Sequence, residues 1–552
     1  MNSTNSDLGD STNSTELLSE PEQVSARSEA VFINPVLLQL AEAGVSAPDS
    51  YQESSAASIV SCQDLAGVFR VWAASRIPLS QKQTRSSISQ RLSEDVAAID
   101  RALNRQVDAI LHNVSFQKME SSWRGLFYLV NQAEQANIDA GRRIGGERHV
   151  KIRILSVKKR ELRRDQETAV EFDRSDLWKK VYEEEFGTAG GMPYGLLVSD
   201  HEFSHHPEDV SLLSGMSETA MAAFAPLIVT PNPEIVGVKD FGSLENFPLI
   251  SETQAAPTYT KWKALREREE SRFIGLPFPR VLGRYGYDGL IGSADAQPAK
   301  ELNWSQRGFR YRERTEQRCG SGRLWLSGVW PFASVVLREF GRSGWFADIR
   351  GSSRSVGDGG QVEGLPVDTF PGFEKSNVRR GPTEFLIPIA MEDEFEEAGL
   401  IPLAGMGPDG RAVFHSNMSL HKPKVFDKQN VTENERLSSM LQYVLCVSRF
   451  AQYLKVILRE KLGSFTEAPD VEKFLNDWIH RYVTPDDQAS VEARAKMPLR
   501  AAEIEVRDEP GSGGAFRIIM RLQPHFQIDR IESTLRLVSA VRYDPSKMGS
   551  KR

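Results

Sequence analysis

Residues 116–130 have the sequence FQKMESSWRGLFYLV, and they decide how the chain is interpreted. The large apolar residues recur at spacings of three and four, which predicts a helix with one buried face. Most amphipathic helices build this face from small aliphatic residues, whereas this one uses a tryptophan and two phenylalanines. On physical grounds alone, the simplest interpretation is a helix of the protein core. The residues of the predicted face are Phe116, Met119, Trp123, Leu126, Phe127 and Val130.

Size and charge limit the classes of protein to which the chain can belong. Its 552 residues are too many for one hydrophobic core, so we expect about two to four packing units. A net charge of −7 argues against nucleic-acid binding, which needs clustered positive charge. Basic clusters at 158–164 and 307–318 are interleaved with or followed by acids, which favours a solvated or interface surface.

The cysteines and the apolar runs indicate a cytoplasmic protein. Cys62, Cys319 and Cys446 lie far apart, without metal-like spacing or a disulfide framework, which fits a reducing compartment. No stretch approaches the roughly 20 apolar residues that span a bilayer, so no membrane insertion is expected. The N-terminus lacks the basic and apolar regions of a secretory signal.

Composition and patterning divide the chain into segments. Residues rich in Ser, Thr, Asn and Glu cannot bury a core, and short apolar runs beyond them need a partner surface. Stretches rich in Gly, Arg and Ser predict long loops or insertions. The predicted segments are a disordered tail (1–30), a docking arm (31–90), an α/β core (91–430) with loops at 284–323 and 351–382, a C-terminal region of helices and assembly strands (431–541), and a tail (542–552).

Helical and strand patterns alternate through the core, which predicts a mixed α/β fold with helix-covered sheets. Residues 149–157 alternate like a strand, and 162–186 resemble one long charged helix. A buried strand is expected at 194–200, a helix from about Pro207, and a second buried strand at 225–231.

Further along, the apolar stretch 324–340 is expected to be buried. Thr432 and Glu435 have the spacing of a capping box, which predicts the start of a helix that ends at Gly463. A second helix is expected around 474–482.

The C-terminal region predicts three strands. Residues 501–508 and 515–526 flank a Gly-rich turn and form a predicted hairpin, and 533–541 adds a third strand. At least one sheet edge then stays unpaired unless something covers it, which is hazardous in a monomer and useful in a polymer. The predicted assembly residues are Ala501, Glu503, Ile504, Val506, Phe516, Ile518, Met520, Leu522, Pro524 and Phe526.

One enzymatic motif occurs, the sequence HEFSH at 201–205. In zinc hydrolases, one helical turn places the two histidines of H-E-x-x-H on the same side of the metal. Here Pro207 favours a helix that starts after the motif, so His201, Glu202 and His205 are expected in a loop with unaligned imidazoles. A zinc-dependent hydrolase is the alternative hypothesis. No Walker A loop or nucleophile elbow occurs, so we expect no catalysis, cofactor or metal.

Short motifs of one known protein family occur in this chain in the order of that family, across roughly residues 90–540. They include WRGL at 123–126, KVYEEEFGT at 180–188, PYG at 193–195, PED at 207–209 and PHF at 524–526. In these motifs the chain resembles the large subunit of the type VI secretion contractile sheath, the TssC/VipB family (EvpB-like). The predicted signature residues are Trp123, Arg124, Gly125, Tyr182, Glu184, Phe186, Gly187, Pro193, Tyr194, Gly195, Pro207, Glu208, Asp209, Phe450 and Tyr453.

The resemblance implies a structural machine part with the sheath-protein fold. Such a subunit polymerises with a small sheath subunit (TssB/VipA-like) and with copies of itself, around an inner tube of Hcp-like hexamers. The sheath lies in the bacterial cytoplasm on a membrane-anchored baseplate, contracts to deliver effectors, and is recycled by a ClpV-like unfoldase. Exchange of C-terminal strands links the subunits. Departures at 324–328 and 307–323 suggest a divergent copy, and a phage-tail-like injection system is a second possible context.

Overall fold

The computed structural model describes most of the chain between residues 61 and 541, in two compact units, Met1–Arg101 and Ala102–Arg552. The predicted tails at 1–30 and 542–552, most of the loop at 284–323, and Phe526 lie outside the described residues. The described ranges are 61–62, 64–76, 84–139, 150–169, 171–188, 191–238, 250–287, 309, 311–314, 322–346, 348–351, 359–367, 369–371, 377–379, 381–406, 411–461, 468–486, 491–508, 516–525 and 535–541.

The first unit contains helix α3 (Leu65–Arg76) and the beginning of α4 (Arg85–Leu111). Trp72 of α3 is buried, and its indole Nε1 donates a hydrogen bond of 2.8 Å to Asp95 Oδ2 on α4. The part of the predicted docking arm that the structure describes is therefore helical, and residues 31–60 of the arm lie outside the described ranges.

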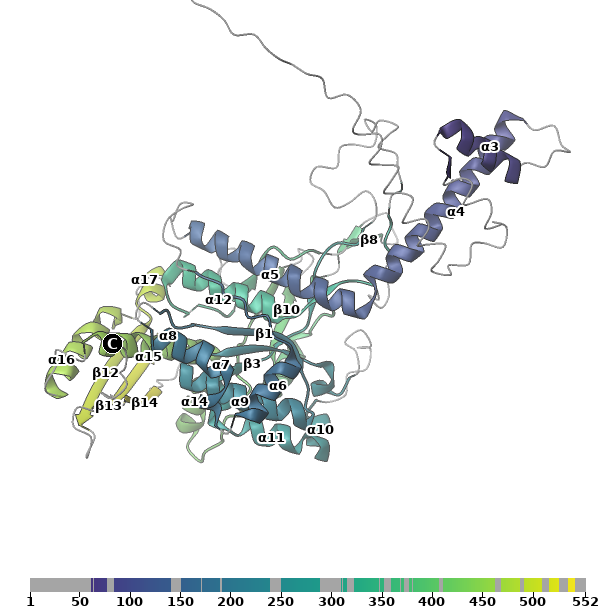
Figure 1. Ribbon diagram of the computed structural model, residues 1–552. Helices are drawn as coiled ribbons and strands as arrows, with labels where there is room; N and C mark the ends of the chain where they lie inside the picture. Colours follow the sequence, from purple (N-terminus) through teal and green to yellow (C-terminus); the bar gives the residue numbers. More distant parts are fainter. Residues whose placement is uncertain are drawn as a thin grey trace, which may run out of the picture. The chain divides into compact units, whose positions relative to one another are not determined.

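The predicted aromatic helix exists as α5 (Val114–Asp139), but its buried face is not the predicted one. Small residues, Gly125 and Ala136, face α12 (Val329–Ser343) and allow a close approach of the two helices, which lie together in Figure 1. A Cβ on Gly125 would lie 2.2 Å from Nε1 of Trp330. The large residues point elsewhere: the exposed fractions are 50% for Met119, 67% for Trp123, 67% for Phe127 and 41% for Val130.

A parallel sheet of β1 (Leu197–Phe203), β2 (Leu227–Pro231) and β3 (Ile274–Gly275) lies at the centre of the second unit. Helix α9 (Pro207–Ala223) connects β1 to β2 and begins at Pro207, as predicted. Alternate residues of a strand face opposite sides of its sheet. In β2, Ile228 packs in the hydrophobic cluster with α12, whereas Leu227 and Val229 pack in the cluster with α9. Figure 1 shows α5 and α12 on one side of this sheet and α9 on the other.

Two predicted elements around this sheet are wrong. Residues 150–157 form no strand: Ile154 is 68% exposed, and no described strand pairs with the segment. The predicted helix 162–186 is interrupted, because the Asp165 carboxylate accepts hydrogen bonds from the amides of Asp176 and Leu177 and so starts a new helical segment. The pieces are α6 (Lys159–Thr168), η1 (Phe172–Arg174), α7 (Asp176–Trp178), the π-helical η2 (Lys179–Glu183) and α8 (Glu184–Phe186).

A second, mixed sheet has the order β4-β10-β11-β7. The predicted loop at 351–382 is not free of structure, because it supplies β7 and the hairpin β8–β9. The predicted buried stretch at 324–340 is confirmed, as it forms β6 and most of the buried helix α12. The strands are β4 (Pro277–Phe278), β5 (Val281–Leu282), β6 (Trp325–Leu326), β7 (Gln361–Val362), β8 (Thr369–Pro371), β9 (Asn377–Arg379), β10 (Ile401–Met406) and β11 (Arg411–Phe414).

Short helices complete this region. They are η3 (Pro233–Val236), α10 (Ile250–Ala255), η5 (Pro257–Tyr259), α11 (Thr260–Arg266), η6 (Glu269–Phe273) and α13 (Ile389–Glu397). The predicted capping box is wrong, because α14 (Gln429–Ser438) begins before Thr432. The Thr432 hydroxyl accepts a hydrogen bond from the Phe426 amide, and the Glu435 carboxylate binds Arg272 instead of the backbone.

The C-terminal module combines helices with the predicted strands, which are confirmed. The strands β12 (Leu499–Asp508), β13 (Phe516–Pro524) and β14 (Leu535–Val541) form an antiparallel sheet with β13 in the middle. Phe450 lies in the core of the module, stacked on Trp345 with 4.2 Å between ring centroids. The helices are α15 (Leu441–Lys461), α16 (Ala468–Ile479), η8 (His480–Tyr482) and α17 (Val491–Lys496).

Candidate functional site

The three residues of the tryptophan signature have three different environments. Trp123 is exposed, whereas Gly125 is buried under the indole ring of Trp330. Arg124 pairs with Glu120 one turn earlier at 2.7 Å and donates a hydrogen bond to the Tyr287 hydroxyl. Gly125 therefore fixes how α5 packs, while Trp123 faces away from the chain's own core.

Four of the exposed apolar residues of α5 form one row, which we call the α5 stripe: Met119, Trp123, Phe127 and Val130. Their spacings of four, four and three residues place them on one side of the helix. Single exposed apolar residues are common on protein surfaces, but a row that includes a tryptophan and a phenylalanine is typical of an interaction surface.

The signature residues Tyr182 and Phe186 lie beside a half-buried lysine of α15. Lys455 Nζ lies 5.0 Å from the ring centroid of Tyr182, 5.5 Å from that of Phe186 and 4.4 Å from that of Phe224. Burial lowers the pKa of Lys455 to about 8, while the three ring faces favour the charged form of the amine. The same turn of the chain accepts a hydrogen bond of 2.6 Å from Arg459 at the Phe186 carbonyl.

The other signature residues around this turn also have structural partners. Buried Gln452 donates to the carbonyl oxygens of Tyr194 and Phe224 at 2.6 and 2.8 Å, which fixes α15 against the end of α9. Gly195 packs against the ring of Phe346, and Pro193 is half-buried beside it. Glu184, Gly187 and Tyr453 are exposed on the surface.

The signature at Pro207-Glu208-Asp209 begins α9 and anchors it to α6. Asp209 Oδ2 accepts hydrogen bonds from the Ser204 amide and hydroxyl, and Lys159 Nζ lies 2.6 Å from Asp209 Oδ1. Burial acts to raise the pKa of Asp209, but the hydrogen bonds from Lys159 and Ser204 outweigh it and lower the pKa. Glu208 pairs with Arg163 at the surface. These residues fix the beginning of the helix.

The two histidines of the HEFSH motif bind separate partners. His201 lies on β1, not in the expected loop, and its Nε2 is 3.0 Å from the Val157 carbonyl oxygen. The ring of His205 stacks on Tyr259 with 4.1 Å between centroids. The motif thus spans the end of a strand and the following connection. A zinc ion held by both imidazoles, as in a metallohydrolase helix, does not fit this arrangement.

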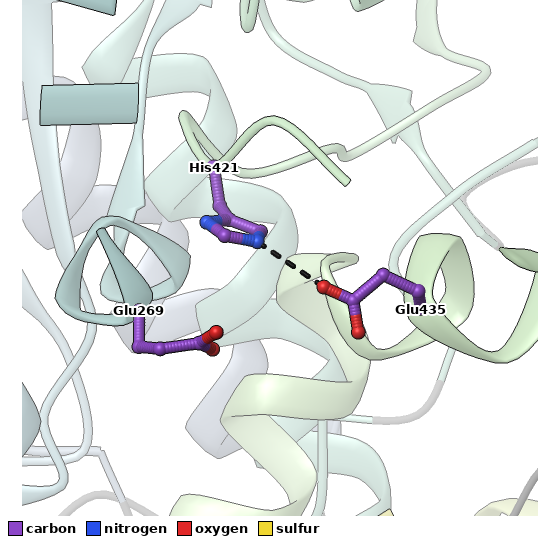
Figure 2. Close-up of side chains that lie close together, drawn as sticks. All are labelled: Glu269, His421 and Glu435. Atoms are coloured by element: carbon purple, nitrogen blue, oxygen red, sulfur yellow. Dashed lines mark hydrogen bonds and ion pairs between the residues drawn. The ribbon is translucent and has the colours of Figure 1, made fainter. Parts of the chain in front are cut away.

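A different group of side chains has the spacing of metal ligands, and the sequence analysis did not find it. Figure 2 shows Glu269, His421 and Glu435, whose nearest ligand atoms lie within 4.8 Å of one another. His421 Nδ1 lies 2.9 Å from the Arg268 carbonyl oxygen and can donate to it, and Nε2 faces Glu435 at 3.4 Å.

Both carboxylates of this group already have cationic partners, since Arg272 pairs with each of them and Lys424 Nζ lies 3.4 Å from Glu269 Oε1. The Nε of Arg272 lies 2.7 Å from Glu269 Oε2, and its Nη2 lies 2.6 Å from Glu435 Oε1. Burial, and then the charge of Arg272, lower the pKa of His421. The group is therefore best explained as an ion-pair cluster that joins η6 to α14.

A second ion-pair cluster joins α5 to the insertion after β5. Arg284 and Glu313 are almost fully buried, with 6% and 0% of their side chains exposed. Arg284 binds Glu313 through two nitrogens, and its Nε lies 2.9 Å from Glu120 Oε1. The basic cluster at 307–318 predicted a solvated or interface surface, and sequence spacing gave no sign that Glu313 lies beside a residue 29 positions away.

The predicted assembly residues of the hairpin fall into an exposed group and a buried group. Ala501 and Glu503 are exposed, while the apolar residues pack against α15 and α16 in the core of the C-terminal module. Pairing with another chain would therefore use backbone groups at an edge of the sheet, and not these buried side chains. The buried residues of this set are Ile504, Val506, Ile518, Met520, Leu522 and Pro524; Phe516 lies on β13.

Comparisons with known proteins match two consecutive parts of the chain. Residues 93–421 match the family model of the EvpB/VC_A0108 tail sheath N-terminal domain, and residues 430–541 match that of the EvpB/VC_A0108 tail sheath gpW/gp25-like domain. A curated relative, the type VI secretion system sheath protein TssC1 of Pseudomonas aeruginosa, is 37% identical over 447 residues. The match covers 80% of this chain and 84% of the relative. Among the described helices, none is both long and apolar enough to cross a membrane.

Proposed function

The chain belongs to the EvpB/VC_A0108 tail sheath family and is a structural subunit of a type VI secretion contractile sheath, and we propose that it acts as the large subunit. In this role it polymerises with a small sheath subunit and with copies of itself into a tube. The tube encloses an inner tube of secreted hexamers, stands on a membrane-anchored baseplate in the cytoplasm, and contracts to propel the inner tube.

The α5 stripe is the observation that carries the proposal. A soluble monomer gains stability by burying tryptophan and phenylalanine, yet Trp123 and Phe127 are each two-thirds exposed. Spacings of three and four residues suit packing against another helix, whose side chains fill the gaps between the large residues. We assign this surface to a helix of the small sheath subunit, which would cover the stripe on assembly.

The C-terminal strands supply a second kind of contact. Main-chain hydrogen bonds between a sheet edge and an added strand contribute about 0.5–1.5 kcal/mol each, so a short strand adds a few kcal/mol per link. The N-terminal arm of a neighbouring copy is the proposed source of one such strand. Because every subunit repeats the link, a small difference between two packings sums over the whole tube, which lets the extended tube contract.

The proposal contains no catalytic step and no bound metal or cofactor. Each histidine of the HEFSH motif has a structural partner, and the carboxylates of Glu269 and Glu435 are paired with Arg272. Recycling by a ring-shaped unfoldase is part of the proposed cycle.

Co-sedimentation with the small sheath subunit tests the proposal. The full chain and the small subunit, expressed together, should pellet as tubes, whereas Phe127→Asp places a charge in the stripe and should abolish the pellet. Val425→Asp is the matched control, because Val425 is 86% exposed outside the stripe and should tolerate the charge. Equal sedimentation of both variants would contradict the assignment of the stripe.

A further inference from the structure

The outer edge of β12 is already occupied by side chains of α16. The amide of Ile504 donates to Asn476 Oδ1 at 3.0 Å, and the Asn476 Nδ2 donates back to the Ile504 carbonyl oxygen at 2.8 Å. Two residues along the strand, the amide of Val506 donates to Glu472 Oε2 at 2.9 Å. Asn476 thus makes the pair of bonds that a neighbouring strand would make.

The match between helix and strand has a geometric basis. Glu472 and Asn476 are one helical turn apart, which is a rise of about 6.0 Å. Residues two apart on a strand are separated by about 6.8 Å and direct their amides to the same side. One turn of α16 therefore serves two successive outward amides of β12, and Figure 1 shows the helix beside this strand.

The first residue of β12, Leu499, is also paired with another segment of the same chain. The Thr484 amide donates to the Leu499 carbonyl oxygen at 2.9 Å, and Val483 forms a parallel bridge with Leu499. An added strand could pair along β12 only after these bonds and those of α16 were broken.

The opposite edge of the sheet is open in the part of the chain that the structure describes. The amides of Ile504 and Val506 point away from β13, so the intervening residues of β12 bond to β13. Because backbone groups alternate along a strand, the amides and carbonyls of Ile518 and Met520 on β13 then point toward β14, where their partners are Ser539 and Leu537. No described strand pairs with the far side of β14. The residues whose amides face that side are Arg536, Val538 and Ala540.

We propose that α16 seals the β12 edge from within the chain, through Glu472 and Asn476, so that a strand of another sheath subunit adds only at the outer edge of β14. The inference rests on the proposed function and adds the side from which subunits are joined. With two open edges, strands could add on either side and subunits could join in more than one order. One sealed edge gives each sheet a single direction of growth.

Hydrogen exchange measured by mass spectrometry on the full chain tests the inference. Sheath from the co-expressed pair is compared with the unassembled subunits from the same preparation. Exchange in 535–541 should slow by roughly tenfold or more on assembly, while the amides of Ile504 and Val506 should be equally protected in both states. If assembly slowed amide exchange only in β12, or did not slow it in β14, the inference would be wrong although the sheath function would stand. If the native pair formed no tubes, the proposed function itself would be contradicted.

Two variants test the two edges separately. Val538→Pro removes an outward amide without removing a bond to β13, so it should abolish tubes; normal tubes would overturn the inference. The double variant Glu472→Ala with Asn476→Ala opens β12 and should give irregular aggregates. Glu472→Gln is its matched control, because the amide oxygen can still accept from Val506 and should preserve tubes. Ordered tubes from the double variant would contradict the seal.

Discussion

Replacing Gly125 by alanine tests the packing that orients α5. The new Cβ would lie 2.2, 2.4 and 2.5 Å from Nε1, Cε2 and Cδ1 of Trp330. Contacts this short cannot persist, so the indole ring or one of the two helices must move. Trp330 is only 8% exposed, and its neighbours Val329 and Phe332 are fully buried, so the ring has little room.

Two opposing effects set the magnitude. Overpacking a well-filled core costs about 1–3 kcal/mol, and the close contact with three ring atoms favours the upper end of that range. Alanine in place of glycine in a helix interior contributes about 1 kcal/mol in the opposite direction. We expect Gly125→Ala to lower the free energy of unfolding by about 2 kcal/mol, the difference between these terms.

A double-mutant cycle with Trp330→Leu separates the two effects. Without the indole ring, Gly125→Ala should become stabilising by about 1 kcal/mol, so that the coupling energy is about 3 kcal/mol. Pulse proteolysis of the dilute full-length chain in urea gives the unfolding free energy for all four proteins. Equal effects of Gly125→Ala in both backgrounds, or no effect in either, would refute the reasoning.

Further predictions concern the buried charges. The pKa of Lys455 is lowered from 10.5 to about 8, so the folded chain releases this proton at a lower pH than the unfolded chain does. The free energy of unfolding should therefore rise between about pH 8 and pH 10.5. Lys455→Met should flatten this rise in a series of thermal melts. Arg284→Met leaves buried Glu313 without its guanidinium partner, with the imidazole of His112 3.1 Å away, and should lower the free energy of unfolding by about 3–5 kcal/mol in urea titrations. Destabilisation below 1 kcal/mol would show that Glu313 is not dependent on Arg284.

Local signals predicted two strands of the central sheet and the helix between them, but not β3. The run at 225–231 contains the fully buried strand β2, and Pro207 begins α9, because a buried strand and a proline in the first helical turn leave patterns in neighbouring residues. The strand expected at 194–200 begins three residues later, as β1, and is mostly half-buried. The C-terminal hairpin was predictable for the same reason: its turn and its strands are adjacent in sequence.

Features set by distant residues were not predictable. The α5 pattern indicated a helix correctly, but the buried face depends on Trp330, which is about 200 positions away. Glu435 fitted a capping box by spacing, yet its carboxylate is held by Arg272 on another element. The spacing of Glu472 and Asn476 becomes meaningful only once β12 lies beside α16. Signals of this kind require the three-dimensional arrangement.

Electron microscopy of the negatively stained, co-expressed pair shows whether this subunit leaves an aromatic row and a strand edge uncovered until sheath subunits assemble. We expect long hollow tubes from the pair and ill-defined aggregates from this chain alone. Dispersed monomers in both samples would contradict it.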